Sequence, residues 1–104
     1  MELQELHELQ ELQECRARID KVDDEILRLF MERMAISLEI GRYKKEQGLP
    51  VLDPMREREK LDLMGGKAGG ELRSYADKLY SLLFELSREF QESHMDKFQE
   101  IHIK

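Results

Sequence analysis

Apolar side chains recur at intervals of three and four residues along most of the chain, the spacing that places them on one face of an α-helix. The longest stretch with this spacing runs from about residue 2 to residue 47 and contains one helix-unfavourable residue, Gly41. Gly48 and Pro50 then end it. A helix of that length extends roughly 65–70 Å, which exceeds the diameter of a globule of this size. We therefore expect much of its apolar face to pack against something else, and a chain of 104 residues favours association with a second copy.

Two further helices are predicted after this stretch. Asp53 offers an N-cap carboxylate and Pro54 suits the first helical position, so the second helix is expected to begin there and to end at Gly65 and Gly66. The segment GGKAGGE is then expected to form a flexible connector, followed by a third helix over about residues 71–97. The expected core face of that helix is Leu72, Ala76, Leu79, Leu83, Leu86 and Phe90. No segment has the pattern of a strand, so the predicted fold class is all-α, with three helices per chain.

The first residues of the chain, ELQELHELQELQE after the initial methionine, are low in complexity. Their leucines are spaced by three, which makes them drift around a helix instead of forming one seam. We interpret residues 1–14 as a solvated or frayed helical extension, with partner binding as the alternative.

Charge and cysteine content narrow the classes of function. The formal net charge is −6, which argues against a general binder of nucleic acid or membranes. The single cysteine, Cys15, cannot form an internal disulfide, and we find neither a signal-peptide pattern nor an apolar window long enough to span a bilayer. We therefore expect a cytoplasmic protein, in which any anion-binding site depends on a few well-placed cations.

Three such cations lie on the face of the long helix that should be buried. Stepping by three and four, this face reads Arg16, Ile19, Asp23, Ile26, Phe30, Arg33, Ser37, Ile40 and Lys44. Because an unpaired buried charge is costly, something must neutralise the three cations. They can extend to solvent or pair with glutamates of neighbouring helices, or they can line an internal pocket for a small polyanion, a task for which the planar fork of arginine is suited.

Spacing along the helix divides these cations between two copies of the chain. Arg33 and Lys44 are separated by about 16 Å along the axis, so their long side chains can converge on one metabolite. Arg16 lies about 25 Å from Arg33, too far to reach the same ligand. An antiparallel second copy of the helix brings an Arg16 back to the site, and a two-fold axis would make two such sites.

The other two helices add weaker candidates. Arg56 and Glu57 lie in the first turn of the second helix, and Ser87 and Gln91 are one turn apart on the third. Considered alone, the serine and glutamine are better explained as ordinary boundary positions. The sequence contains no Ser-His-Asp set, activated cysteine, phosphate-binding loop or cluster of metal ligands. An enzyme of this kind would act through positioning and electrostatics.

These residues together resemble the core signature of the all-α chorismate mutases. The segment RARIDKVDDEILRLFMERMAISLEIGRYKKEQGLPVLDPMREREK contains the family's elements in order, and the third helix adds the S-x-x-x-Q pattern. The matching positions are Arg16, Ile19, Asp20, Asp23, Glu32, Arg33, Ile40, Gly41, Lys44, Pro50, Asp53, Arg56, Glu57, Ser87 and Gln91. The resemblance covers residues 15 to about 92, and the ordered set is more specific than any of its parts. It defines a mutase domain over residues 15–98, with residues 99–104 as a tail.

The resemblance implies an intertwined homodimer with shared active sites that converts chorismate to prephenate on the route to phenylalanine and tyrosine. It implies that Arg33 and Arg16 of the partner subunit bind the two carboxylates of chorismate. Lys44 should bind a carboxylate and the ether oxygen, and Gln91 should donate an N–H to that oxygen. The remaining contacts implied are Glu57 and the backbone near Asp53 to the ring hydroxyl, and Ser87 and Arg56 to the carboxylates.

This chemistry agrees with the residues present. A Claisen rearrangement needs no nucleophile, acid, base, metal or cofactor; the enzyme selects the reactive conformer and stabilises the oxygen that becomes anionic. Since Gln91 donates without having to be protonated, we expect little pH dependence of activity between about pH 6 and 8.

Two alternatives remain on the sequence alone. Isochorismate pyruvate lyase uses a similar cationic pocket on the same fold, although the complete D-x-x-R-E and Ser/Gln set favours the mutase. A non-catalytic helical dimerisation or regulatory module is the other, although a retired site would be expected to have lost some of Arg16, Arg33, Lys44, Glu57 and Gln91.

Overall fold

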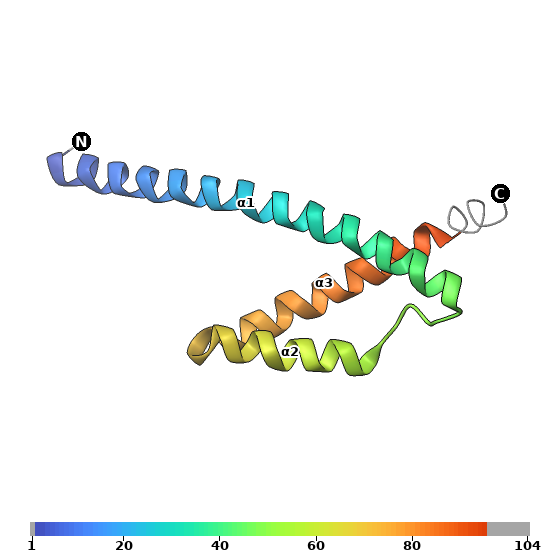
Figure 1. The fold of residues 1–104 in the computed structure, drawn as a ribbon. Helices are drawn as coiled ribbons and strands as arrows, with labels where there is room; N and C mark the ends of the chain where they lie inside the picture. Colours follow the sequence, from blue (N-terminus) through green and yellow to red (C-terminus); the bar gives the residue numbers. More distant parts are fainter. Residues whose placement is uncertain (1, 96–104) are drawn as a thin grey trace. The chain divides into compact units, whose positions relative to one another are not determined.

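The computed structural model describes residues 2–95, and these form three α-helices and one 3-10 turn with no strand among them. In chain order the elements are α1 (Leu3–Gln47), α2 (Pro54–Ala68), η1 (Gly70–Leu72) and α3 (Arg73–Ser93). Figure 1 shows this order, with α2 and α3 side by side. The all-α class with three helices is thereby confirmed. The third helix begins at Arg73 and ends at Ser93, with His94 as its C-cap, so it is shorter than the predicted span of about 71–97. The expected tail at 99–104 lies outside the described residues.

The chain divides into two units, Met1–Arg33 and Met34–Lys104. In the described part of the first unit every residue belongs to α1 except Glu2, and the N-terminal leucines are helical and exposed. Arg28 pairs with Glu25 and Glu32, and His7 pairs with Glu11, all of them exposed and one helical turn apart. Such pairs stabilise a helix by only a few tenths of a kcal/mol each, about 0.2–0.5 kcal/mol. The side chains of this unit therefore give its helix only modest local support.

The second unit contains the end of α1 together with α2, η1 and α3. The start of α2 is as predicted, because the side chain of Asp53 accepts a hydrogen bond from the backbone N–H of Arg56 at 3.1 Å and Pro54 occupies the first turn. This cap satisfies one of the N–H groups that a helix start leaves without a partner.

The predicted end of the second helix is wrong. Gly65 and Gly66 do not stop α2, which continues to Ala68, so most of the expected flexible connector is helical. The chain turns instead at Gly69, which has φ 63°, a conformation that glycine adopts without steric cost.

Gly65 has a packing role instead of a terminating one. A Cβ atom built at this buried residue would lie 2.8 Å from Oδ1 of Asp77 and 3.3 Å from Cγ of Arg73. The same addition at Gly66 meets nothing within 4 Å. The absence of a side chain at Gly65 therefore permits the close approach of α2 and α3.

The burial pattern also differs from the expected core. Phe84, which is outside the predicted row on the third helix, is the buried large hydrophobic residue among those described, whereas Leu72 and Leu79 are 62% and 54% exposed in the single chain. On α1 the predicted inward row is exposed at Ile19, Ile26 and Ile40, and the buried residues of this helix are Ser37 and Gly41. Periodicity identified the apolar rows, but one chain does not cover them.

Candidate functional site

A buried polar cluster joins α1 to α3 within the second unit. Ser37, Ser87 and Gln91 are 4%, 9% and 5% exposed. Nε2 of Gln91 donates to Oγ of Ser37 at 2.9 Å, and the Ser37 hydroxyl lies 3.4 Å from the backbone carbonyl oxygen of Ser87. Four residues separate Ser87 from Gln91, so both lie on one face of α3.

One atom of this cluster has no partner among the described residues. Oε1 of Gln91 is buried and accepts no hydrogen bond. Most buried polar side-chain atoms in proteins are hydrogen-bonded, to protein or to ordered water, and exceptions tend to mark sites of function. The terminal amide of Gln91 is therefore the described group whose hydrogen-bonding capacity is most plainly incomplete.

Lys44 lies near the end of α1 and is half-buried. Its Nζ donates to the backbone carbonyl oxygen of Val51 at 2.8 Å, across the turn that leads to α2. An ammonium group carries three donors, so this bond leaves capacity for an anion. The contact also ties the turn after α1 to the helix before it.

Glu57, in the first turn of α2, is held by an arginine of α3. Nη1 of Arg88 donates to both carboxylate oxygens of Glu57, at 2.6 and 2.5 Å. The two side chains are 24% and 28% exposed, so the pair is partly shielded from solvent. Charge-assisted hydrogen bonds are shorter and stronger than neutral ones, and this pair fixes the Glu57 carboxylate against α3.

The other predicted site residues are placed individually. Asp53 and Arg56 are exposed at the start of α2, where the Asp53 carboxylate caps the helix. Arg16 and Arg33 belong to the first unit, Arg16 exposed and Arg33 half-buried. Within the second unit the structure thus brings Ser87 and Gln91 together, and it gives Lys44 and Glu57 partners that the sequence did not indicate.

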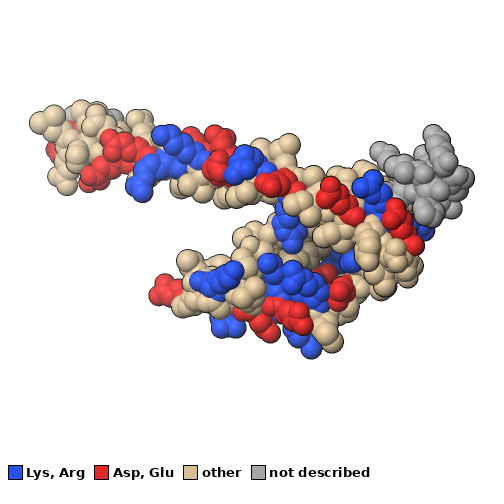
Figure 2. All heavy atoms as spheres, viewed as in Figure 1, with Lys and Arg blue, Asp and Glu red and all other residues tan. Residues whose placement is uncertain are grey.

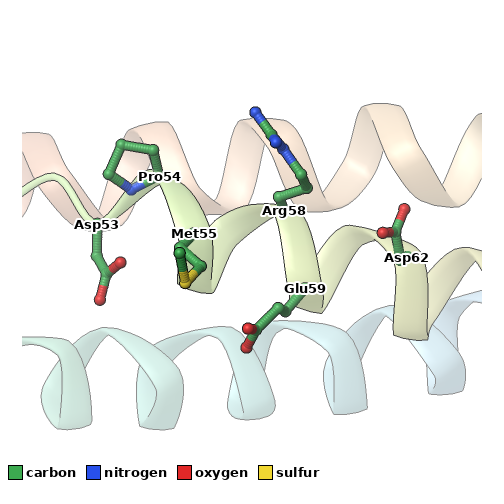
Figure 3. Close-up of a pocket in the computed structure, with 6 residues that line it drawn as sticks. All are labelled: Asp53, Pro54, Met55, Arg58, Glu59 and Asp62. Carbon is green, nitrogen blue, oxygen red and sulfur yellow. The ribbon is translucent and has the colours of Figure 1, made fainter.

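A shallow pocket beside the start of α2 is a separate feature (Figure 3). It is lined by Asp53, Pro54, Met55, Arg58, Glu59 and Asp62. Asp53 and Glu59 project to the same side of the helix, while Arg58 points away from them. Three carboxylates against one guanidinium make this pocket unsuited to a dianion, and among the predicted site residues it includes Asp53 alone.

The charges of the visible surface are mixed. In Figure 2 acidic and basic side chains lie side by side over α2. Across the described residues 2–95 no three His, Cys, Asp or Glu side chains gather where they could hold a metal ion. Over the same residues no helix is both long and apolar enough to cross a bilayer.

Comparison of the sequence with known protein families identifies the family of this chain. The family model for chorismate mutase type II matches residues 15–92, a span that contains all the residues of the predicted site. The chain belongs to the type II chorismate mutase family. The resemblance inferred from the sequence motifs is therefore confirmed.

Three curated relatives show how the similarity is distributed. A chorismate mutase of Methanocaldococcus jannaschii is 27% identical over 86 residues, which cover 81% of this chain and 87% of that protein. A bifunctional chorismate mutase/prephenate dehydratase of Aquifex aeolicus is 48% identical over 44 residues, 42% of this chain and 12% of the relative. The T-protein of Haemophilus influenzae is 38% identical over 42 residues, 40% of this chain and 11% of the relative. The first of them is similar over most of its length, and the other two only over a short part.

Two residues that contact predicted site residues were not themselves predicted. Ser37 stood in the inward row of α1, but a serine there gave no sign that its hydroxyl would meet Gln91. Arg88 directly follows Ser87 in the sequence, and its guanidinium reaches Glu57 on another helix. A signal for Arg88 was available, because a carboxylate at a partly buried site is usually paired with a cation.

Proposed function

We propose that this chain converts chorismate to prephenate in the biosynthesis of phenylalanine and tyrosine, without a metal or an organic cofactor. The observation that carries the proposal is the family match over residues 15–92, within which every residue of the predicted site is present. The reaction is a pericyclic rearrangement in which a C–O bond breaks as a C–C bond forms. The protein must therefore hold the compact conformer of the substrate and stabilise the ether oxygen as negative charge develops on it.

Cations select the reactive conformer in this proposal. Chorismate carries two carboxylates, and Arg33 together with Arg16 of the partner subunit would bind them in bidentate fashion. Lys44 would contribute a third positive charge, shared between a carboxylate and the ether oxygen. Ser87 and Arg56 would complete the carboxylate contacts. Fixing both carboxylates restricts the rotations that separate the reacting carbons. Substrate binding therefore supplies part of the activation free energy of the rearrangement.

The ether oxygen would receive its second donor from Gln91. A terminal amide carries two N–H groups on one nitrogen, and the bond to Ser37 uses one of them. The second can donate to the oxygen of the breaking bond. In a buried setting such a donor is worth more than in water, because no solvent dipoles compete with it.

The ring hydroxyl would donate to Glu57. The bond from Arg88 supports this role, since the guanidinium holds the carboxylate in one orientation. Asp53 would act mainly through the backbone that its cap holds in place.

We propose further that the active protein is a homodimer with two shared sites in the cytoplasm. Large apolar side chains along α1, among them Ile19, Ile26 and Ile40, are about half exposed in the single chain. Large apolar side chains exposed repeatedly along one helix are typical of an interface. A second copy would cover it and would supply its Arg16 to the site. The exposed, unpaired thiol of Cys15 is compatible with a reducing compartment.

The test is a direct assay with chorismate. Loss of its ultraviolet absorbance would be followed with purified protein, and the product identified by chromatography. Arg33→Ala should lower kcat/KM by about 100-fold or more, because truncating one partner of a buried charge pair costs roughly 2–5 kcal/mol. Arg28→Ala is the matched control on the same helix, since Arg28 pairs only with Glu25 and Glu32 in the described residues and is exposed. Absence of prephenate with wild-type protein, or equal activity of the two variants, would contradict the proposal.

A further inference from the structure

Ser37 is the most buried polar residue of the described chain, and neither the family motif nor the proposed chemistry gives it a role. It lies on α1 and contacts Gln91, 54 positions later on α3. A serine hydroxyl both donates and accepts, whereas a backbone carbonyl only accepts. The Ser37 hydroxyl, which lies 3.4 Å from the carbonyl oxygen of Ser87, therefore directs its proton there. Its lone pair is left to accept from Gln91.

The direction of these hydrogen bonds decides whether the nitrogen or the oxygen of the Gln91 amide faces Ser37. A glutamine amide can turn over and exchange its nitrogen and oxygen, and a hydroxyl alone accommodates either arrangement. With the hydroxyl proton committed to the carbonyl of Ser87, the arrangement with nitrogen toward Ser37 is favoured. At 3.4 Å the bond to the carbonyl is long, so it sets this direction more than it adds stability.

We propose that Ser37 is a positioning residue, whose hydroxyl holds the Gln91 amide with one N–H engaged and the other presented to the ether oxygen of the substrate. This inference rests on the proposed function, because it assigns Ser37 a part in the same reaction. It also has a component independent of catalysis, namely that the orientation and exchange of the Gln91 amide depend on Ser37. The two components are tested separately.

The kinetic test compares Ser37→Ala with Ser37→Thr. Alanine removes the hydroxyl and favours the helix, so the fold should be retained. We expect kcat to fall about 3- to 10-fold, the worth of one net hydrogen bond, with KM unchanged, because negative charge on the ether oxygen develops only in the transition state. Threonine keeps the hydroxyl and should restore most of the rate. Wild-type kcat in Ser37→Ala would overturn the proposal.

A double-mutant cycle shows whether Ser37 acts through Gln91. Gln91→Ala removes the donor, so adding Ser37→Ala to it should cause no further loss of kcat. An equal loss in both backgrounds would mean that Ser37 supports the fold only, and would overturn its positioning role.

The pH profile gives a readout that a structural role would not move. In Gln91→Glu the new carboxyl must be protonated to donate to the ether oxygen, so activity falls as pH rises through its pKa. In this variant the Ser37 hydroxyl can turn its proton from the neutral carbonyl of Ser87 to the ionised carboxylate, which is the stronger acceptor, and so lowers that pKa. Adding Ser37→Ala should raise the apparent pKa of the alkaline limb and keep the enzyme active to higher pH. An unmoved limb would contradict the proposal.

Nuclear magnetic resonance of the uniformly 15N-labelled protein tests positioning without any turnover. The side-chain amide pair of Gln91 is assigned by its disappearance in Gln91→Glu. In wild type we expect slow exchange with solvent for the N–H bonded to Ser37, and in Ser37→Ala a faster exchange with a changed chemical shift. An unchanged pair overturns the proposal even if chorismate is converted. A changed pair in a protein that does not convert chorismate supports the contact and places the failure in the proposed function.

Discussion

The two units of the chain are held by different kinds of interaction. In residues 34–95 hydrogen bonds join positions far apart in the sequence, such as Ser37 to Gln91 and Glu57 to Arg88. In residues 2–33 the ion pairs of His7 and Arg28 join neighbouring turns of one helix and are exposed. The first unit also carries exposed leucine, isoleucine and valine side chains that its own chain does not cover. The second unit therefore contains the internal framework of the proposed site, whereas the first exposes the apolar side chains that the proposed dimer would cover.

The sharpest test of this difference is complementation between two inactive variants. Arg16→Ala and Arg33→Ala should each lose activity by about 100-fold or more, since each removes one carboxylate contact. In a mixed dimer one of the two sites regains both arginines, so co-expression should restore about a quarter of wild-type activity. Specific activity of the copurified mixture is the measurement. A mixture no more active than its components would show that the first unit does not contribute Arg16 across a dimer.

A charge on the apolar face of the first unit should break the assembly itself. Ile26 is 58% exposed in the single chain, and Ile26→Lys would place an ammonium group in the proposed interface. We expect a loss of dimer stability of about 3 kcal/mol or more, because a buried unpaired charge is costly. Light scattering and the thermal midpoint would measure it. Lys21→Glu, at an exposed polar position, is the control and should remain dimeric.

A smaller effect is expected from the ion pair of the second unit. Arg88→Met removes the bond to Glu57 while retaining much of the apolar stem. We expect kcat/KM to fall about 10-fold, since the carboxylate would lose its fixed orientation, and stability to fall by about 1 kcal/mol, because the pair is partly exposed. Assays at low and high salt would show a smaller difference between variant and wild type at high salt. An Arg88→Met enzyme with wild-type kinetics would remove the positioning role of this pair.

The smallest expected effect is a difference in stability between alanine substitutions at two adjacent glycines of α2. Gly65→Ala should lower stability by about 1 kcal/mol, because its Cβ would lie 2.8 Å from the Asp77 carboxylate and the neighbouring side chains would have to shift. Gly66→Ala meets nothing within 4 Å and should raise stability by roughly 0.5–1 kcal/mol through helix propensity. Thermal unfolding measures both. Equal shifts of the same sign would contradict the packing role of Gly65.

Local chemistry predicted some of these elements correctly. The N-cap at Asp53 followed from its own side chain and the next residue, and the structure has it there. The continuous helix α1 followed from the absence of breakers before Gly48. In these cases the residues that decide the structure are neighbours in the sequence.

The errors arose where residues distant in the sequence decide the structure. The sequence predicts a helix end at Gly65, but this glycine lies inside α2 because it lets Asp77 and Arg73 of α3 approach closely, which no local pattern shows. Phe84 is buried although it lies off the main apolar row, and Leu79 on that row is exposed in the single chain. The contacts of Ser37 with Gln91 and of Arg88 with Glu57 likewise depend on how the helices pack. The roles of the predicted site residues remain a prediction that the kinetic experiments decide.

Because of the exposed apolar face of α1, the specific activity of the enzyme should depend on its concentration. In the proposed dimer a lone copy lacks one arginine of its site and leaves isoleucines in water, so mass action links assembly, helix stability and turnover. Specific activity would then fall on dilution and recover on concentration, with a midpoint at the dissociation constant of the pair. A cell that makes too little of this protein would lose more than a proportional share of its flux.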